Sequence, residues 1–386
     1  MTEPPDPGTN VALYVHWPYC ARICPYCDFN VVRDRGRAEE QAALVEAILS
    51  DLRAQAAMLG ARRLASIFFG GGTPSLMAPE AVARIVEEAR RLFAPSGPIE
   101  VTLEANPTDA EAGRFAALAQ AGVNRLSMGV QALDDASLRF FGRNHSAGEA
   151  IRAVETARRA FPRLSIDLIY ARPEQTVEGW TAELIQALAL GFEHVSPYQL
   201  TVEPETAFGR ALRRGSLVPP DEDQAAALYE TTQAVLSAAG FEAYEVSNHA
   251  RGTAARSAHN LHVWRGGDYL GLGPGAHGRL TLEGLRTATV AHRRIGDYVA
   301  GVLAGAPWAE REAMDTAGEA EERALLGLRT VEGVPLANLA PLGLRAGGGA
   351  LESLIADGFL RIEGERLVAT QRGRPVLDGV LKALLT

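Results

Sequence analysis

Short apolar runs rich in β-branched and aromatic residues alternate with longer segments of helical periodicity. In the segment 78–93, Val82, Ile85 and Val86 recur on one face, and Pro79 stands near the first turn, as is typical of an amphipathic helix. The strand-like runs are apolar enough to be covered on both faces, so the pattern predicts an α/β fold with a parallel sheet. The predicted strands are Val11–His16, Leu64–Phe69, Ile99–Glu104, Arg125–Val130, Leu164–Tyr170 and His194–Leu200.

Unusual residues stand near the C-terminal ends of these predicted strands. Cys20 follows the first run, the segment 70–75 the second, Glu104 ends the third, Gln131 follows the fourth, and Asp167 lies late in the fifth. In barrel enzymes this face collects the active-site loops, whereas an open sheet spreads such residues along a crevice. The pattern therefore favours a partial (β/α)6 TIM-like barrel, with a full barrel and an open doubly wound sheet as alternatives.

After Pro219 the pattern changes. Gln224–Ala239 is helix-like, Tyr244–Val246 is strand-like, and Gly266–Gly278 is crowded with turn signals. Three domains are therefore expected: a barrel over residues 1–235, an extension over 236–309 and a C-terminal domain over 310–386.

The last part of the chain has its own pattern of two helices followed by a strand pair. The helices are predicted at Glu321–Leu328 and Ala350–Asp357, and Leu360–Val368 alternates like a hairpin around Glu363 and Gly364. This predicts a small winged-helix-like α+β domain, whose role is either to contact DNA or to dock a protein or cover a substrate.

The net charge of the chain helps to decide which partners are expected. The chain of 386 residues has 38 basic and 47 acidic residues, a formal net charge of −9, and its basic residues form no block that would follow a phosphate backbone. Nucleic acid is therefore not an expected partner, and the C-terminal domain is expected to dock a protein or cover a substrate. The segment 1–10 lacks the features of a signal peptide, and no apolar run is long enough to cross a membrane, so a cytoplasmic protein is expected.

The only cysteines are Cys20, Cys24 and Cys27, which fall in one short segment. Three cysteines cannot all pair, so the cluster indicates a reducing compartment and a metal or redox site. Three thiolates would leave one iron of a 4Fe-4S cluster open to another ligand, whereas a structural zinc site requires four ligands. Zinc held by the three cysteines and His16 is the alternative.

The spacing Cys20-x3-Cys24-x2-Cys27, with Tyr26 before the last cysteine, resembles the signature of the radical S-adenosylmethionine superfamily. The resemblance implies a 4Fe-4S cluster whose open iron binds the methionine amino and carboxylate groups of S-adenosylmethionine. It also implies that Tyr26 packs near the adenine, and that the cluster delivers the electron that breaks the sulfonium bond.

Further motifs follow in order along the chain. They are FFGGGTPS at 68–75, LEANP at 103–107, GVQ at 129–131, the segment around Arg143, and DLIY at 167–170, and together they resemble the oxygen-independent coproporphyrinogen oxidase branch of that superfamily. The resemblance implies S-adenosylmethionine contacts from Tyr14, Gly71, Gly72, Thr73, Glu104, Gln131, Arg143 and Asp167. Taken singly, a glycine turn or a carboxylate at a strand end also has a structural interpretation.

Two departures speak against porphyrinogen decarboxylation. The oxidases carry a fourth cysteine two positions after the cluster motif, where this chain has Phe29. They also have an N-terminal extension over the substrate, whereas only about ten residues precede the first predicted strand here.

The segment 259–264, with sequence HNLHVW, resembles the HNxxYW motif of the HemW haem-chaperone subfamily. The resemblance implies haem binding, with His259, Asn260 and Trp264 as candidates, because imidazole is a common ligand of haem iron and an indole can pack on a porphyrin. Three other histidines are alternative ligands, namely His249, His262 and His277. No CxxCH motif is present, so covalent attachment is not indicated.

Two positions differ from the family pattern. Val263 replaces the tyrosine of HNxxYW, so the hydroxyl of that tyrosine is absent here. Ala171-Arg172-Pro173-Glu174 replaces the common glycine-leucine-proline-glycine in a loop near Asp167.

The expected function is a haem chaperone that binds haem, a 4Fe-4S cluster and S-adenosylmethionine and delivers haem to respiratory haemoproteins. The rival is an oxygen-independent coproporphyrinogen III dehydrogenase or another radical oxidoreductase. Catalytic residues are not assigned, and a homodimer and a peripheral contact with a membrane are left open.

Overall fold

The computed structural model describes residues 9–344 and 349–385, so most of the segment 1–10 lies outside the described residues. Within this part of the chain, the main sheet has 12 strands in the order β14-β13-β12-β11-β1-β4-β5-β6-β7-β8-β10-β9. Its central strands run parallel in chain order. They are β1 (Asn10–Trp17), β4 (Arg63–Gly71), β5 (Glu100–Ala105), β6 (Arg125–Gln131), β7 (Arg163–Tyr170) and β8 (His194–Gln199).

This topology confirms the predicted partial barrel. The order of the central strands has no reversal, which a doubly wound sheet would need. The outer members of the central set also pair elsewhere, β1 with β11 (Asp268–Leu272) and β8 with β10 (His249–Ala250), so the barrel stays open.

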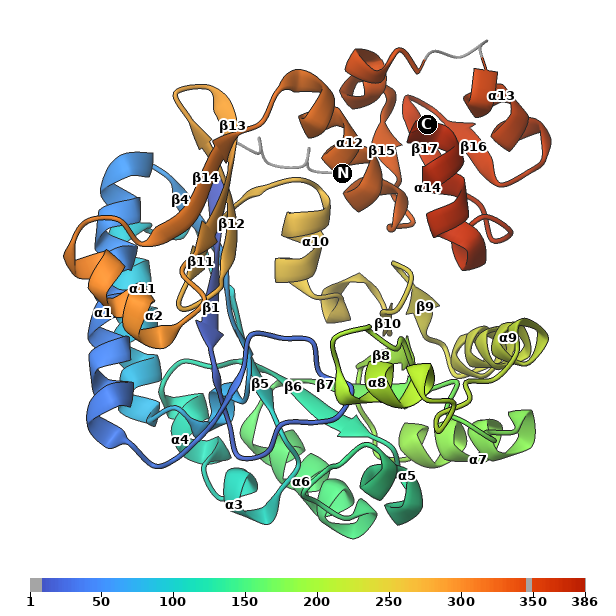
Figure 1. The fold of residues 1–386 in the computed structure, drawn as a ribbon, viewed down its shortest axis with the longest axis horizontal. Coiled ribbons are helices and arrows are strands. Elements are labelled where there is room, and N and C mark those ends of the chain that lie inside the picture. The colour runs from blue at the N-terminus through green and yellow to red at the C-terminus, as the bar shows by residue number, and fades with distance from the viewer. Residues whose placement is uncertain (1–8, 345–348, 386) are drawn as a thin grey trace.

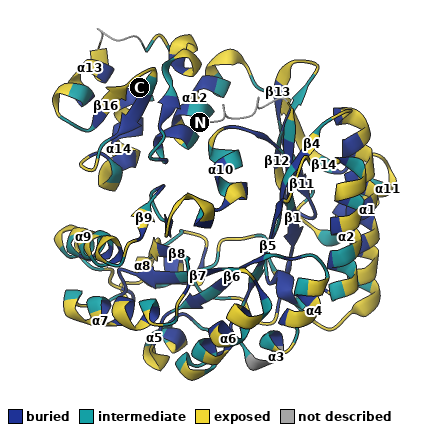
Figure 2. Cartoon of the chain, turned by 180° about the vertical axis from the view of Figure 1, so that it is seen from behind, coloured by how far each residue is buried: buried dark blue, intermediate teal, exposed yellow. Residues whose placement is uncertain are grey.

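Helices cover the convex face of the curved sheet (Figure 1). The predicted apolar stripe of α2 is buried, with Val82 and Ile85 fully inaccessible. Figure 2 shows the same division, with buried residues on the strands and exposed residues on the outer sides of the helices. The helices of the barrel are α1 (Ala38–Leu59), α2 (Pro79–Leu92), α3 (Asp109–Ala112), α4 (Phe115–Gln120), α5 (Asp135–Phe140), α6 (Ala147–Ala160), α7 (Val177–Leu188), α8 (Ala207–Arg213) and α9 (Glu222–Ala238).

Antiparallel strands extend the sheet at both edges. The predicted strand at Tyr244–Val246 is wrong: the pairing strands are β9 (Glu242–Ala243) and β10, and the Tyr244 amide instead closes a turn onto the Asn248 carbonyl. Gly266–Gly278 is also more regular than its turn signals suggest, since it contains β11. Beyond β11 the edge consists of β12 (His277–Leu282), β13 (Leu285–Ala291) and β14 (Trp308–Ala313), with α11 (Ile295–Leu303) between the last two.

Helix α10 (Ala258–Trp264) lies on the concave side of the sheet (Figure 1). The Glu100 carboxylate at the start of β5 accepts hydrogen bonds from the amides of Ala258 and His259, each at 3.0 Å. A carboxylate is favourable at a helix N-terminus, where amide groups lack partners within the helix. Glu100 therefore anchors the HNLHVW segment inside the barrel.

The C-terminal part has its own apolar core, which includes Leu328, Leu339, Leu351 and Leu367. The predicted hairpin forms, and the predicted α+β character is confirmed. The elements are α12 (Thr316–Leu328), β15 (Val334–Pro335), α13 (Gly349–Ala356), β16 (Leu360–Glu363), β17 (Arg366–Ala369) and α14 (Leu377–Leu385). The proposed domain division stays a prediction, and β14 crosses its boundary at 309/310.

None of the helices in the described ranges combines the length and apolar character that crossing a bilayer requires.

Candidate functional site

The three cysteines lie at the C-terminal ends of the central strands. After β1 the chain passes through β2 (Tyr19–Cys20) and a loop to β3 (Val32–Arg33). Cys20, Cys24 and Cys27 line one cavity of about 360 Å³, called here the first cavity. The Cys27 amide donates to the Cys24 carbonyl at 3.2 Å, which closes a turn between these two cysteines.

The three cysteine thiols are free. Burial raises the pKa of Cys20, and burial together with its cysteine neighbours raises the pKa of Cys27 to about 11. A cationic metal cluster reverses this preference, because coordination favours the thiolates. Arg143 donates to the Cys24 sulfur at 3.5 Å and adds positive charge beside it. The donor set therefore fits an iron–sulfur cluster.

His16 does not face the cysteines. Its Nε2 donates to the Asn30 carbonyl at 2.8 Å, and its Nδ1 accepts from the Tyr14 hydroxyl at 3.1 Å. Among the described residues, no group of three or more His, Cys, Asp and Glu side chains is arranged to hold a single metal ion. Because both ring nitrogens of His16 are already bonded, the alternative of zinc held by His16 and the cysteines would require these two bonds to break.

The glycine motif is joined to the cysteine segment through the backbone. The Gly72 amide donates to the Trp17 carbonyl at 2.7 Å, and the Thr73 amide to the Tyr19 carbonyl at 2.9 Å. A Cβ at Gly72 would lie 2.7 Å from the Tyr19 oxygen, so this close approach requires glycine. Gly71, at φ 105°, donates from its amide to the Glu104 carboxylate at 3.2 Å.

Two carboxylates line the first cavity from β5 and β7, the strands on either side of β6. Burial and the nearby Asp167 raise the pKa of Glu104 to about 8. Burial likewise raises the pKa of Asp167 to about 6, and Ser127 donates to this carboxylate at 3.4 Å. Such a pair lacks enough donors of its own, so a ligand with hydroxyl or ammonium groups would satisfy it.

Gln131 and Arg143 each leave a buried polar atom without a partner in the described structure, Oε1 of Gln131 and Nε of Arg143. Gln131 also has a left-handed backbone, with φ 68°, which is costly for a residue with a side chain. Arg143 donates to the Gly129 carbonyl at 2.8 Å and to Asn106. The free acceptor and donor, together with the strain, are what a polar ligand site requires.

The first cavity thus brings together almost every residue predicted to contact S-adenosylmethionine. Tyr26, Gly71, Gly72, Thr73, Glu104, Gln131, Arg143 and Asp167 all line it with the cysteines. Tyr14 is the exception, because it lines a different cavity. Asn106, Ser127 and Tyr198 also line this cavity and were not predicted from the sequence, although Asn106 stands inside the LEANP motif together with Glu104.

A second cavity, of about 660 Å³, lies between α10 and the strands β1, β4 and β11–β14. Asp28 and Phe29 line both cavities, and the Phe29 side chain is 61% exposed. All three haem candidates, His259, Asn260 and Trp264, line the second cavity. The two predicted sites are therefore neighbours, separated by the residue that replaces the fourth cysteine.

The histidines differ in their surroundings. The His259 ring is buried, forms a hydrogen bond through Nδ1 with Ser66 at 3.0 Å, and burial lowers its pKa to about 3. His249 is buried against Gln233, away from both cavities. Of the alternatives, only His277 lines the second cavity among the described residues.

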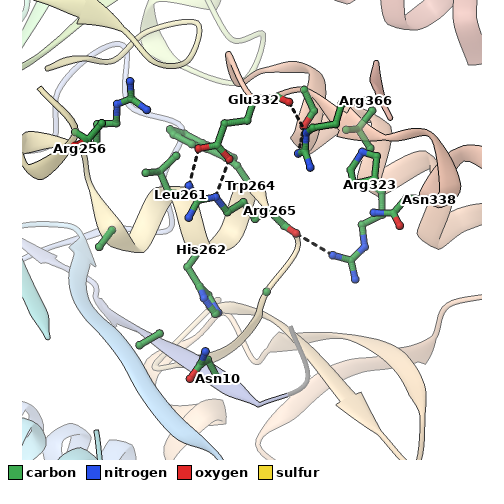
Figure 3. Close-up of a pocket in the computed structure, with 18 of the residues that line it drawn as sticks. Asn10, Arg256, Leu261, His262, Trp264, Arg265, Arg323, Glu332, Asn338 and Arg366 are labelled. Carbon is green, nitrogen blue, oxygen red and sulfur yellow. Dashed lines mark hydrogen bonds and ion pairs between the residues drawn. The ribbon is translucent and has the colours of Figure 1, made fainter. Parts of the chain in front are cut away.

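His262 and Trp264 belong to a third cavity, of about 930 Å³, between α10 and the C-terminal part. His262 donates through Nε2 to the Asp268 carbonyl at 2.8 Å. Figure 3 shows this cavity, in which Arg265 pairs with Glu332 and Arg323 reaches the backbone after α10. Trp264 therefore stands between the second and third cavities.

The family comparisons agree with this geometry. Residues 14–184 match the family model described as the radical SAM superfamily, and residues 318–376 match the HemN C-terminal domain. Escherichia coli coproporphyrinogen III oxidase (HemN) has a similar structure, with a TM-score of 0.81 over 99% of this chain and 91% of that one. At 21% sequence identity this likeness shows the fold alone.

Sequence relatives extend over the full length. The mouse protein named radical S-adenosyl methionine domain-containing protein 1, mitochondrial, is 40% identical over 100% of this chain and 90% of its own length. Proteins named heme chaperone HemW are 38% identical in Mycobacterium tuberculosis, over 99% of this chain and 96% of theirs, and 34% identical in Escherichia coli K12, over 97% and 98%. The chain therefore belongs to the radical SAM superfamily, in the family that contains the HemW proteins.

Proposed function

We propose that the protein is a haem chaperone that binds haem beside a 4Fe-4S cluster and S-adenosylmethionine and passes the haem to respiratory haemoproteins. The observation that carries this proposal is the second cavity, which shares Asp28 and Phe29 with the cysteine cavity and is lined by the HNLHVW segment. Its volume of about 660 Å³ lies in the range of cofactor sites, and its aromatic walls suit a porphyrin. Relatives carry the name heme chaperone HemW.

In the first cavity, Cys20, Cys24 and Cys27 would hold the cluster, which when bound supplies a single electron to the sulfonium. The unpartnered Nε of Arg143 and the amide oxygen of Gln131 would orient the methionine carboxylate and amino groups. Glu104 and Asp167 would accept hydrogen bonds from hydroxyl or ammonium groups, which relieves their burial as a pair. Tyr26, packed edge-on against Phe141, would flank the adenine.

Phe29 is what favours a chaperone over a coproporphyrinogen III dehydrogenase. Phe29 stands at the sequence position of the oxidases' fourth cysteine, and it lines both cavities. The opposing activity is tested by complementation of a strain that lacks the oxygen-independent oxidase. We expect no restoration of haem synthesis, and restoration would overturn the chaperone assignment.

The cofactor assignment is tested by anaerobic reconstitution with iron and sulfide, followed by electron paramagnetic resonance of the reduced protein. We expect S-adenosylmethionine to change the cluster signal, because it binds the open iron. An unchanged signal would remove the open-iron argument. The three free thiols also fit a reducing, cytoplasmic location, which remains part of this proposal.

A further inference from the structure

We propose that His277 supplies the axial ligand to haem iron in the second cavity and that Arg293 binds a haem propionate at its rim. This inference rests on the proposed function, because it names the residues that hold the cargo. It moves the ligand from α10, where the sequence motif places it, to the first residue of β12.

His277 is the accessible imidazole of the cavity. It is exposed, and its ring has no hydrogen-bond partner among the described residues. Partial burial of the ring lowers its pKa, the charges of Arg279 and Arg293 lower it further, and Glu310 opposes them, so the net shift favours the neutral ring. A neutral, unpartnered imidazole that faces a cavity is what iron ligation requires.

The other imidazoles that line the second cavity are already engaged. His16 uses both ring nitrogens, with Tyr14 and the Asn30 carbonyl. His259 is 5% exposed and is held by Ser66 and by the Phe68 ring at 5.0 Å. To reach an iron, His259 would have to leave its bond with Ser66, so we assign it as a positioning residue that fixes α10 against β4.

The backbone around His277 is built to keep the ring at this place. A Cβ at Gly271 would lie 2.2 Å from the His277 carbonyl oxygen, so β11 approaches His277 only because it has glycine there. Asn30 donates through Nδ2 to the Pro274 carbonyl at 2.9 Å and to the Arg293 carbonyl at 2.8 Å. These bonds tie Arg293 and the turn that precedes His277 to the residue next to Phe29.

The cavity walls match the rest of a haem molecule. Tyr14, Phe29, Phe68, Trp264 and Tyr269 provide aromatic surface. Arg293 is exposed at the rim, and its guanidinium has no hydrogen bond or ion pair among the described residues, which leaves it available for a carboxylate. Glu310 lines the same cavity and would repel a propionate on its own side. The charges therefore favour one orientation, with a propionate at Arg293.

The test is a titration of the full-length, cluster-reconstituted protein with ferric haem, followed by the Soret band. We expect His277→Gln to weaken haem binding about tenfold or more. His277→Cys should bind haem with the shifted spectrum of thiolate ligation, a change that a merely structural role of His277 would not produce. Arg293→Gln should weaken binding by a smaller factor with an unchanged Soret position. His292→Gln, an adjacent loop histidine outside the cavity lining, is the matched control and should bind like the parent protein.

The outcomes separate the two levels of the proposal. If the parent protein binds no haem, the proposed function fails. If the parent binds haem, and His277→Gln and His277→Cys keep its affinity and Soret position, the ligand assignment is overturned and the chaperone function stands. The assignment is overturned in the same way if His259→Gln alone abolishes the iron-ligand band while folding, checked by circular dichroism, is unchanged.

Discussion

The first and second cavities share two residues but are built in different ways. The first is formed at the ends of consecutive parallel strands, and its polar groups are buried, strained or unpartnered, as in Gln131 and Arg143. The second is formed by the sheet edge and α10, and its candidate iron ligand, His277, is exposed. The first therefore suits a resident cofactor held by fixed groups, and the second suits a cargo that must enter and leave.

The largest expected difference between the cavities comes from Cys24→Ser. Loss of one thiolate should abolish cluster assembly, because the cluster relies on three ligands. Haem affinity should stay within about twofold of the parent value if the second cavity is independent. Iron content and a Soret titration measure the two effects. Equal loss of iron and haem binding would show that the cavities form one site.

Asn30→Ala tests the link between the cavities. Removing the amide leaves the Pro274 and Arg293 carbonyls without this donor, so the free energy of unfolding should fall by about 2 kcal/mol. Haem affinity should fall as well, because Arg293 loses its anchor, while iron content remains that of the parent. Asn338→Ala, in the third cavity, is the matched control for urea unfolding and should change little. A variant as stable as the parent would contradict this role.

Glu104→Gln tests whether the first cavity raises the pKa of Glu104. The folded state raises the pKa of Glu104 from 4.5 to about 8, so it binds a proton more tightly than the unfolded state does. The free energy of unfolding of the ligand-free protein should therefore fall as the pH rises from about 4.5 to about 8. Gln cannot ionise, so the variant should show a weaker decline in urea unfolding between these pH values. Identical pH dependence of the free energy of unfolding in the two proteins would contradict the raised pKa of Glu104.

The smallest effect concerns the loop after β7. Glu174 is exposed with φ 60°, at a position where the family pattern has glycine. Glu174→Gly should raise the free energy of unfolding by about 0.5 kcal/mol, since relief of the left-handed strain slightly exceeds the entropy cost of glycine. Glu178→Gly, in the first turn of α7, should instead lower it by about 1 kcal/mol. A decrease of similar size in the free energy of unfolding of both variants would contradict backbone strain at Glu174.

The strands and the first cavity were largely predictable, because periodicity locates strands and motifs stand at their ends. The second cavity was less predictable from the sequence. The docking of α10 depends on hydrogen bonds between Glu100 and residues more than 150 positions away, which no local pattern reveals. Tyr14 is a second example, because the motif resemblance predicts a contact with S-adenosylmethionine, whereas the residue lines the second cavity. The missed strand β11 has a related cause, because the glycines that signal turns there serve close backbone approach.

We propose that the two neighbouring cavities hold a cluster-bound cofactor and a haem at the same time. The most direct measurement is a ferric haem titration of the reconstituted full-length protein in the presence of S-adenosylmethionine, with the Soret band and the cluster signal recorded on the same samples. The account predicts saturation at one haem per chain with the S-adenosylmethionine-dependent cluster signal retained. Absence of a saturable Soret change, or displacement of S-adenosylmethionine by haem, would contradict it.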